Sequence, residues 1–170
     1  MPTNTLDPMY GMYHLLPAPG IPFDGLGPSK YEPDPDKYVW PNGLVSLQSP
    51  AWMTVICGNH REVVKVTLEK LDEAPGDPSD EWETAVDISM FNPTGALQVV
   101  DWDGRPVENL RIDVPPSDEW VRVRVLATHR REHAEHTKER HLIQVWTSPE
   151  APEVVHRMDE YGQQRAEPRR

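Results

Sequence analysis

The chain is poor in cysteine, in long apolar runs and in basic residues, and each shortage excludes a class of protein. Cys57 is the single cysteine, so no internal disulfide can form, which fits a reducing cytoplasm. The first residues lack a basic stretch followed by an apolar run, and no segment is apolar over the length that spans a bilayer. We therefore expect no signal peptide, no membrane contact and a cytoplasmic location.

The shortage of basic residues gives the chain a strong acidic balance. Lysine and arginine number 17 against 28 aspartates and glutamates, so the formal net charge is −11. Such a balance opposes binding to nucleic acid and favours a basic partner. We predict that the partner is a basic protein, such as a nuclease or toxin, and that nucleic acid is not bound. Association with further copies of the chain stays open.

Catalytic motifs are also lacking. The chain contains no Gly-x-Ser-x-Gly, Ser-x-x-Lys, P-loop or dinucleotide fingerprint. Cys57 lies in the strand-like run TVICG, where a buried, unreactive side chain is the default interpretation. The acidic pair Asp101 and Asp103 falls at a turn, where aspartate commonly caps the backbone. We predict a protein that is not an enzyme and uses no cofactor.

Four of the seven histidines, His129, His133, His136 and His141, lie between two strand-like runs. A zinc protease would have His-Glu-x-x-His on a helix, with the glutamate as base. Here His129 and His133 have the right spacing, but two arginines follow the first histidine and oppose a nearby cation. The segment also lacks an apolar face that would fix a helix against a core. We predict a polar loop that holds no metal.

Composition divides the chain into three segments, residues 1–42, 43–148 and 149–170. Proline and glycine punctuate the first, which argues against a long helix or a central strand there. Its scattered aromatic residues are unlike a disordered tail, so we expect an extended Pro/Gly-rich arm that packs on the core. Docking of this arm on a partner, or its exchange between subunits, is the alternative. The last segment has room for a short helix and then a charged, frayed tail.

The middle segment alternates between apolar and polar residues, as antiparallel strands with one wet face do. In WVRVRVLA, for example, valines alternate with Arg122 and Arg124. About eight such runs, separated by turn signals such as FNPTG and DWDG, predict an all-β fold, an antiparallel β-sandwich. The predicted core comprises Val64, Val66, Leu68, Val86, Ile88, Leu97, Val99, Leu110, Ile112, Val121, Val123, Val125, Ile143 and Val145.

Acidic residues gather in one turn-like stretch, and we predict that they bind the basic partner. Carboxylates in this density imitate the phosphates of a nuclease substrate and speed encounter with a basic cleft. An acidic balance that serves solubility alone is the plain alternative. The candidates are Glu73, Asp77, Asp80 and Glu81, in and just after EAPGDPSD, together with Asp34 and Asp36 of the expected arm.

Tryptophan suggests a different function, a carbohydrate- or ligand-binding module. β-Sandwiches often carry ligand sites, and aromatic rings supply stacking platforms. Trp102, Trp120 and Trp146 fall at strand ends near loops and are the candidates for such a site. Packing of the same rings in the core or in turns is the simpler interpretation. A structural or assembly protein is a further alternative.

Three stretches within residues 43–146 carry a resemblance to a known family. They are GLVSLQS with the strand pair after it, TAVDISMFNPTGALQVVDWDG followed by LRIDVPPSDEWVRVRVLA, and the closing RHLIQVW. Their order of strands and turns resembles the ComJ-like competence proteins, which act as inhibitors of a DNA-entry nuclease. The resemblance implies a nuclease inhibitor or immunity-type partner without catalysis. It assigns no individual residue, and residues 1–42, the EAPGDPSD stretch and residues 129–141 have no counterpart in it.

Overall fold

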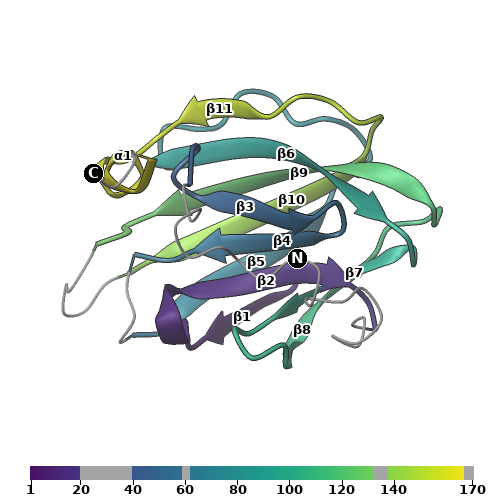
Figure 1. The fold of residues 1–170 in the computed structure, drawn as a ribbon, viewed down its shortest axis with the longest axis horizontal. Helices are drawn as coiled ribbons and strands as arrows, with labels where there is room; N and C mark the ends of the chain where they lie inside the picture. Colours follow the sequence, from purple (N-terminus) through teal and green to yellow (C-terminus); the bar gives the residue numbers. More distant parts are fainter. Residues whose placement is uncertain (20–39, 59–61, 132–137, 167–170) are drawn as a thin grey trace.

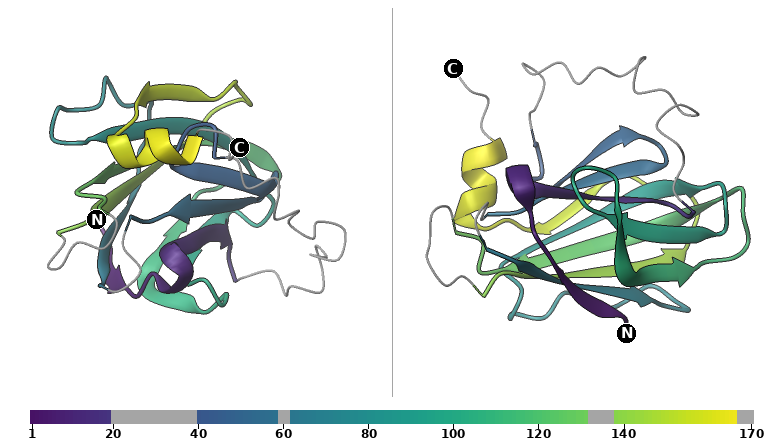
Figure 2. Two further views of the ribbon diagram at one scale, coloured as in Figure 1. Left: turned by 60° about the vertical axis from the view of Figure 1, so that its left-hand side comes forward. Right: turned by 90° about the horizontal axis from the view of Figure 1, so that it is seen from below.

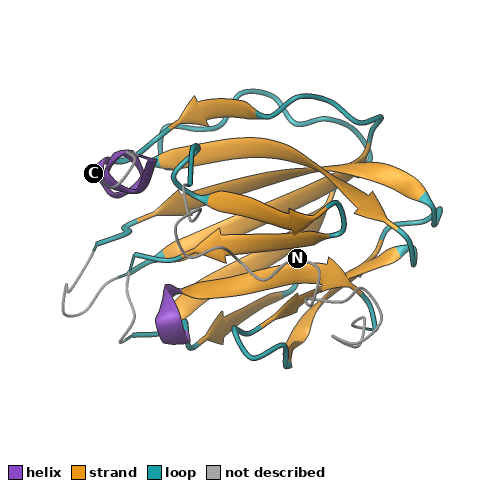
Figure 3. Cartoon of the chain, viewed as in Figure 1, coloured by secondary structure: helices purple, strands orange, loops and turns teal. Residues whose placement is uncertain are grey.

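The computed structural model describes residues 1–19, 40–58, 62–131 and 138–166, and strands make up most of this part (Figure 3). Within these residues no helix is long and apolar enough to cross a membrane. The elements are β1 (Thr3–Leu6), a 3-10 turn (Met9–Gly11), β2 (Met12–Pro17), β3 (Val45–Ser49), β4 (Trp52–Ile56), β5 (Val64–Lys70), β6 (Thr84–Asn92), β7 (Ala96–Val100), β8 (Pro106–Asp113), β9 (Glu119–Thr128), β10 (Arg140–Thr147), β11 (Val154–Arg157) and α1 (Glu160–Ala166).

The strands form two sheets (Figures 1 and 2). The first, sheet A, has six strands in the order β1-β5-β10-β9-β6-β11, and the second, sheet B, has five in the order β3-β4-β2-β7-β8. Neighbours are antiparallel except β5 and β10, which are parallel. The expectation of a purely antiparallel fold is therefore wrong at this pair. Sequence periodicity cannot reveal it, because strand alternation is the same in both orientations.

One apolar cluster fills the space between the two sheets and draws on both of them. All fourteen residues predicted for the core are buried and belong to it. This part of the prediction is confirmed. It succeeds because successive strand side chains point to opposite faces, so the apolar residues of each run reach the same side of their sheet.

The strand β2 corrects the prediction that residues 1–42 hold no central strand. It pairs with β4 on one side and β7 on the other, so it is an inner strand of sheet B. Tyr13 and Leu15 of β2 are fully buried. Pro17 stands at the last position of the strand, where its missing N–H disturbs the ladder least. The prediction missed this strand because it judged residues 1–42 by their overall proline content, although six consecutive residues within them form a strand.

The outer face of sheet A is not the wet face that the sequence pattern predicted. Arg122 and Arg124, assigned to solvent from the alternation of β9, are only 6 % and 5 % exposed. The chain after β10 covers the first, because Arg122 donates to the backbone carbonyls of Ala151 and Pro152. The chain that follows β10 thus passes over this face and buries the Arg122 side chain there.

The expected short helix near the C-terminus is confirmed as α1. Before it, β11 pairs with β6 and becomes an edge strand of sheet A. Tyr161 of α1 packs with Trp40 and Ile56 in a second small apolar cluster. The helix comes close because Gly43, at φ +69°, faces Gly162, and a Cβ on Gly43 would lie 2.5 Å from the Gly162 Cα. The C-terminal residues described here are therefore packed against the sheets.

Candidate functional site

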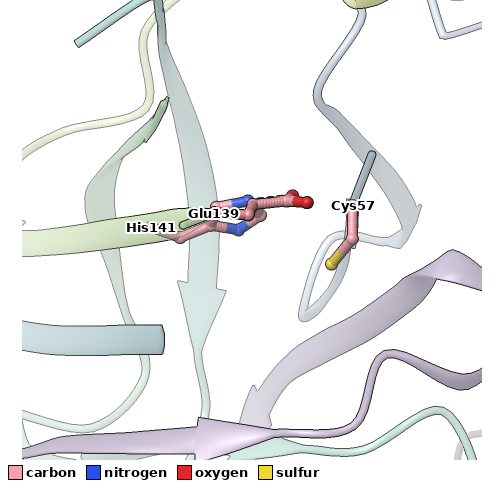
Figure 4. A group of neighbouring side chains, drawn as sticks. All are labelled: Cys57, Glu139 and His141. Carbon is pink, nitrogen blue, oxygen red and sulfur yellow. Dashed lines mark hydrogen bonds and ion pairs between the residues drawn. The ribbon is translucent and has the colours of Figure 1, made fainter. Parts of the chain in front are cut away.

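A cluster of polar side chains lies inside the core. It joins Cys57, directly after β4, with Glu139 and His141, which flank the start of β10 (Figure 4). The alternation of β10 turns His141 to the inner face, in line with Ile143 and Val145. All three polar residues are buried, at 2 % exposure or less. A thiol, a carboxylate and an imidazole therefore share one site that water does not reach.

Hydrogen bonds run through this cluster and connect the two sheets. The Tyr13 hydroxyl oxygen lies 2.8 Å from His141 Nδ1, and His141 Nε2 lies 2.9 Å from Glu139 Oε1. The backbone N–H of Gly58 donates to both Glu139 oxygens, at 3.0 and 3.2 Å. One side-chain atom from each of Cys57, Glu139 and His141, of the kinds that can bind a metal ion, lies within 4.8 Å of the other two. Sequence patterns do not reveal this assembly, because Tyr13, Cys57 and the neighbouring pair Glu139 and His141 come from three distant parts of the chain.

Burial favours the protonated forms of Cys57 and Tyr13 in this cluster. It raises the pKa of the Cys57 thiol well above the ordinary value; Glu139 raises this pKa further, and Arg130 opposes the rise. Burial likewise raises the pKa of the Tyr13 hydroxyl, with Cys57 and Glu139 as additional causes. Nucleophilic catalysis by cysteine needs a thiolate in a partly exposed, electropositive site. The predicted burial of Cys57 is confirmed, and the environment of this thiol does not activate it.

A buried ion pair lies next to the cluster. Arg130 is fully buried, and its guanidinium donates to both oxygens of Asp159 and to the carbonyl of Gly43. The same guanidinium sits 5.2 Å from the centre of the Tyr161 ring. A charge in this position holds α1 and the strand ends together. Sequence reasoning missed Arg130 because it belongs to the uniformly polar run HRREH, in which no residue stands out.

The histidine run divides between different environments. His129 is exposed just after β9, whereas His141 is buried in β10. The prediction that His141 belongs to a polar loop is therefore wrong. His133 and His136 lie outside the described residues, so the absence of metal at these two histidines stays a prediction. The local signal for His141 was its place in RHLIQVW, where it occupies an inward position of a regular strand.

The acidic residues proposed for partner binding differ in how they are paired. Glu73 and Asp77 are exposed and have no ion-pair partner among the residues that the structure describes. Asp80 pairs with Arg157 at 3.2 Å, and Glu81 pairs with Arg140 at 2.7 Å. The hydrogen bond from Arg140 is the first cause of the lowered pKa of Glu81. Asp34 and Asp36 lie outside the described residues.

Arginines of sheet A hold the acidic stretch against the sheet. Arg124 of β9 donates to the carbonyl of Gly76, and Asp87 of β6 holds the guanidinium of Arg124 through two further hydrogen bonds. Arg157 of β11 donates to the carbonyls of Ser79 and Trp82. The connection between β5 and β6, residues 71–83, is therefore fixed at several points, and we call it the acidic loop. The sequence predicted the charge of this loop, but it did not predict the hydrogen bonds from arginines that hold the loop against the sheet.

The three candidate tryptophans do not form one platform. Trp102 lies in the turn between β7 and β8 of sheet B, with its ring centre 4.7 Å from that of the exposed Tyr10. Trp120 and Trp146 belong to β9 and β10 of sheet A, and Trp146 is buried. The acidic pair Asp101 and Asp103 lies in the same turn. Its carboxylate caps the backbone as predicted, since Asp101 Oδ1 accepts a hydrogen bond from the Asp103 backbone N–H.

Comparison with proteins of known structure identifies the fold. No family model and no curated protein sequence matches the chain. Among solved structures, ComJ from Bacillus subtilis superposes with a TM-score of 0.58 over 87 % of this chain and 96 % of its own. This chain has the fold of ComJ. The sequence identity is 6 %, so the likeness concerns the fold and carries no residue across.

ComJ is described as an inhibitor of the DNA degrading activity of NucA. A second solved structure, described as crocagin biosynthetic gene J, superposes with a TM-score of 0.55 at 14 % identity, over 86 % of this chain and 96 % of its own. The resemblance to ComJ-like proteins predicted from the order of strands and turns is thus confirmed as a likeness of fold. It extends beyond residues 43–146, because it covers most of the chain.

Proposed function

We propose that this protein is a non-catalytic binding protein, an inhibitor or immunity-type partner of a basic protein such as a nuclease. The fold of ComJ over most of the chain is the observation that carries the proposal, since ComJ inhibits the activity of NucA. We further propose that the two sheets act as a β-sandwich scaffold, with loops as the contact surface, and that the role is cytoplasmic.

The net charge of −11 supports a basic partner. Proteins that bind nuclease-like clefts benefit from acidic surfaces, because complementary potentials steer the encounter and disfavour wrong partners. In this chain the acidic loop is anchored by arginines from three strands of sheet A. A loop fixed before binding loses less conformational entropy on association than a mobile one.

Within the acidic loop we assign the direct contact to Glu73 and Asp77. These two carboxylates are exposed and carry no intramolecular ion pair in the described structure, whereas Asp80 and Glu81 are already paired with arginines. A paired carboxylate would have to exchange one cation for another, which reduces the net gain on binding. The unpaired ones meet a basic partner without that exchange.

The experiment is capture of the partner on the immobilised full chain from a lysate of the source organism, followed by a nuclease assay on the captured protein. We expect a basic nuclease whose DNA cleavage the chain inhibits. Replacing Glu73→Lys and Asp77→Lys together is expected to weaken binding roughly tenfold or more, about 1.4 kcal/mol, as measured by titration calorimetry.

The matched control is Asp7→Lys with Glu108→Lys, which changes the net charge by the same amount. These residues are exposed, next to β1 and on β8, on the opposite side of the molecule from β11 (Figure 1). The control is expected to keep the equilibrium affinity within about twofold at physiological salt, where distant exposed charges are largely screened. Equal weakening by both pairs would remove the acidic loop as the contact, and a captured partner with no nuclease activity would overturn the proposed function.

A further inference from the structure

We propose that Cys57, Glu139 and His141 form a binding site for a divalent transition-metal ion of the zinc class, inside the core between the two sheets. The three residues offer sulfur, oxygen and nitrogen donors that lie within 4.8 Å of one another and are all buried. This site is separate from the acidic loop, so the proposal does not depend on the proposed inhibitor function.

The donor set selects the class of ion. Zinc binds cysteine sulfur, histidine nitrogen and carboxylate oxygen, and mixed sets of these are its usual ligands. Magnesium and calcium prefer sites made of oxygen alone, and a thiolate disfavours them. A site with one donor of each kind therefore fits zinc or a similar borderline metal. Three protein ligands leave one tetrahedral position of the ion for a further donor.

The geometry needs only a small adjustment to hold such an ion. With bonds of about 2.0 to 2.3 Å, tetrahedral ligands lie roughly 3.3 to 3.6 Å apart. His141 Nε2 and Glu139 Oε1 are 2.9 Å apart, close to this value, and they face each other (Figure 4). The Cys57 sulfur, one ring nitrogen of His141 and one carboxylate oxygen of Glu139 lie within 4.8 Å of one another. A separation of 4.8 Å exceeds the tetrahedral value by roughly 1.2 to 1.5 Å, which the side chains would close on binding the ion.

The surroundings orient the ligands as a metal site requires. Tyr13 Oη contacts His141 Nδ1 at 2.8 Å, which leaves Nε2 directed at Glu139. The Gly58 N–H donates to both oxygens of the Glu139 carboxylate and fixes its orientation. Partners of this kind, on the far nitrogen of a ligating histidine and on a ligating carboxylate, set ligand orientation in known metal sites. Both contacts are compatible with a bound ion.

Charge balance also favours an ion here. A thiolate and a carboxylate together carry two negative charges, and a divalent cation compensates both of them. Binding would break the S–H bond of Cys57 and release that proton to solvent, while the sulfur electron pair forms the metal bond. The His141–Glu139 hydrogen bond would be exchanged for two metal bonds. For this, Nε2 gives up its proton to solvent and Nδ1 takes one up, so that the neutral imidazole donates from Nδ1 to the Tyr13 hydroxyl oxygen. The rival interpretation is a purely structural hydrogen-bond chain that binds no ion.

Titration of the metal-free full chain with zinc chloride, and separately with cobalt(II) chloride, distinguishes a metal site from a purely structural hydrogen-bond chain. We expect one equivalent of zinc, an increase in the melting temperature, and a cobalt spectrum with a thiolate-to-metal charge-transfer band. The nearly isosteric variant Cys57→Ser should lose the band and weaken zinc binding at least about tenfold. Glu139→Gln should weaken zinc binding by a similar factor.

His14→Gln is the matched control, since His14 is a buried imidazole that bonds Thr54 away from the cluster. It should leave zinc binding and the cobalt band unchanged, and circular dichroism verifies the fold of every variant. Absence of stoichiometric zinc binding would overturn the proposal. Zinc binding that persists in Cys57→Ser without a cobalt thiolate band would also overturn it, because the ion would then sit elsewhere. Neither outcome bears on the nuclease assay.

Discussion

Single charged residues inside the fold determine more of its stability than the sequence pattern suggests. Asp87 of β6 and Arg124 of β9 stand opposite each other in the register and form a pair at 2.7 Å, with 9 % and 6 % of their side chains exposed. His156 Nε2 lies 3.0 Å from the other oxygen of Asp87. Burial acts to raise the pKa of Asp87, but hydrogen bonds from Arg124 and His156 outweigh it and the net pKa is lowered.

The lowered pKa predicts a loss of stability in acid. A carboxyl whose folded pKa is below its unfolded value stabilises the fold above the unfolded pKa and loses this contribution as pH falls through the folded pKa. We expect Asp87→Asn to lower the free energy of unfolding by about 3 kcal/mol at pH 7, because Arg124 remains buried without its partner. The deficit should shrink as the pH falls below the ordinary aspartate value of 3.8.

Urea unfolding of the wild type and Asp87→Asn between neutral and acid pH measures this difference. Asp113→Asn is the control, because Asp113 is exposed on β8 and its ion-pair contact with Arg111 is long at 3.8 Å. It should leave the free energy of unfolding unchanged at every pH. A deficit for Asp87→Asn that stays constant into acid would show that the carboxylate charge does not stabilise the fold.

At the scale of elements, the N-terminal segment tests what holds sheet B together. β2 separates β4 from β7, so its removal leaves the backbone groups of both strands that face β2 without partners and opens the core at Tyr13 and Leu15. β1 lies at the edge of sheet A, where β5 is its partner among the described strands. The two strands come from the same short stretch of chain but have unequal importance.

Deletion of residues 1–19 is therefore expected to abolish the cooperative thermal transition, whereas deletion of residues 1–6 should keep it at a lower midpoint. Far-UV circular dichroism with thermal melts of both truncated chains measures the result. If the chain without residues 1–19 melted like the full protein and only failed to bind the nuclease, the segment would act as a docking arm.

At the scale of the whole molecule, net charge and local contact affect binding in different ways. On the proposed function, the formal charge of −11 would act at a distance and set how fast a basic partner is encountered, while the acidic loop would set how long the partner stays bound. At low salt we expect the Glu73/Asp77 and Asp7/Glu108 lysine pairs to slow association by similar factors. Raising the salt should remove most of this effect, because the Debye length falls.

Stopped-flow or surface-plasmon kinetics with the captured nuclease measures both rates. The dissociation rate should increase for the Glu73/Asp77 pair alone. An association rate that does not respond to salt would contradict electrostatic steering and leave the acidic balance as a matter of solubility.

The sequence alone determined the strand-rich fold and most of its core. Alternation with period two is a local property, so runs such as EVVKVTLEK and LRIDV identify their own inward side chains, and every predicted core residue is buried. The turn at Asp101 was predictable for the same reason, because its carboxylate bonds the backbone only two residues further along the chain. The order of strands and turns was also sufficient to indicate the fold of ComJ at 6 % identity.

Only the tertiary structure decided which strands are neighbours and which polar residues are enclosed. The parallel pairing of β5 with β10 and the central place of β2 depend on contacts between distant parts of the chain. Arg124 has the pattern of a solvent-facing residue, and it is buried because a separate connection crosses its face. Glu139 and His141 are neighbours at the start of β10, but Cys57 meets them only because two sheets pack together, and no local pattern encodes a contact over that separation in sequence.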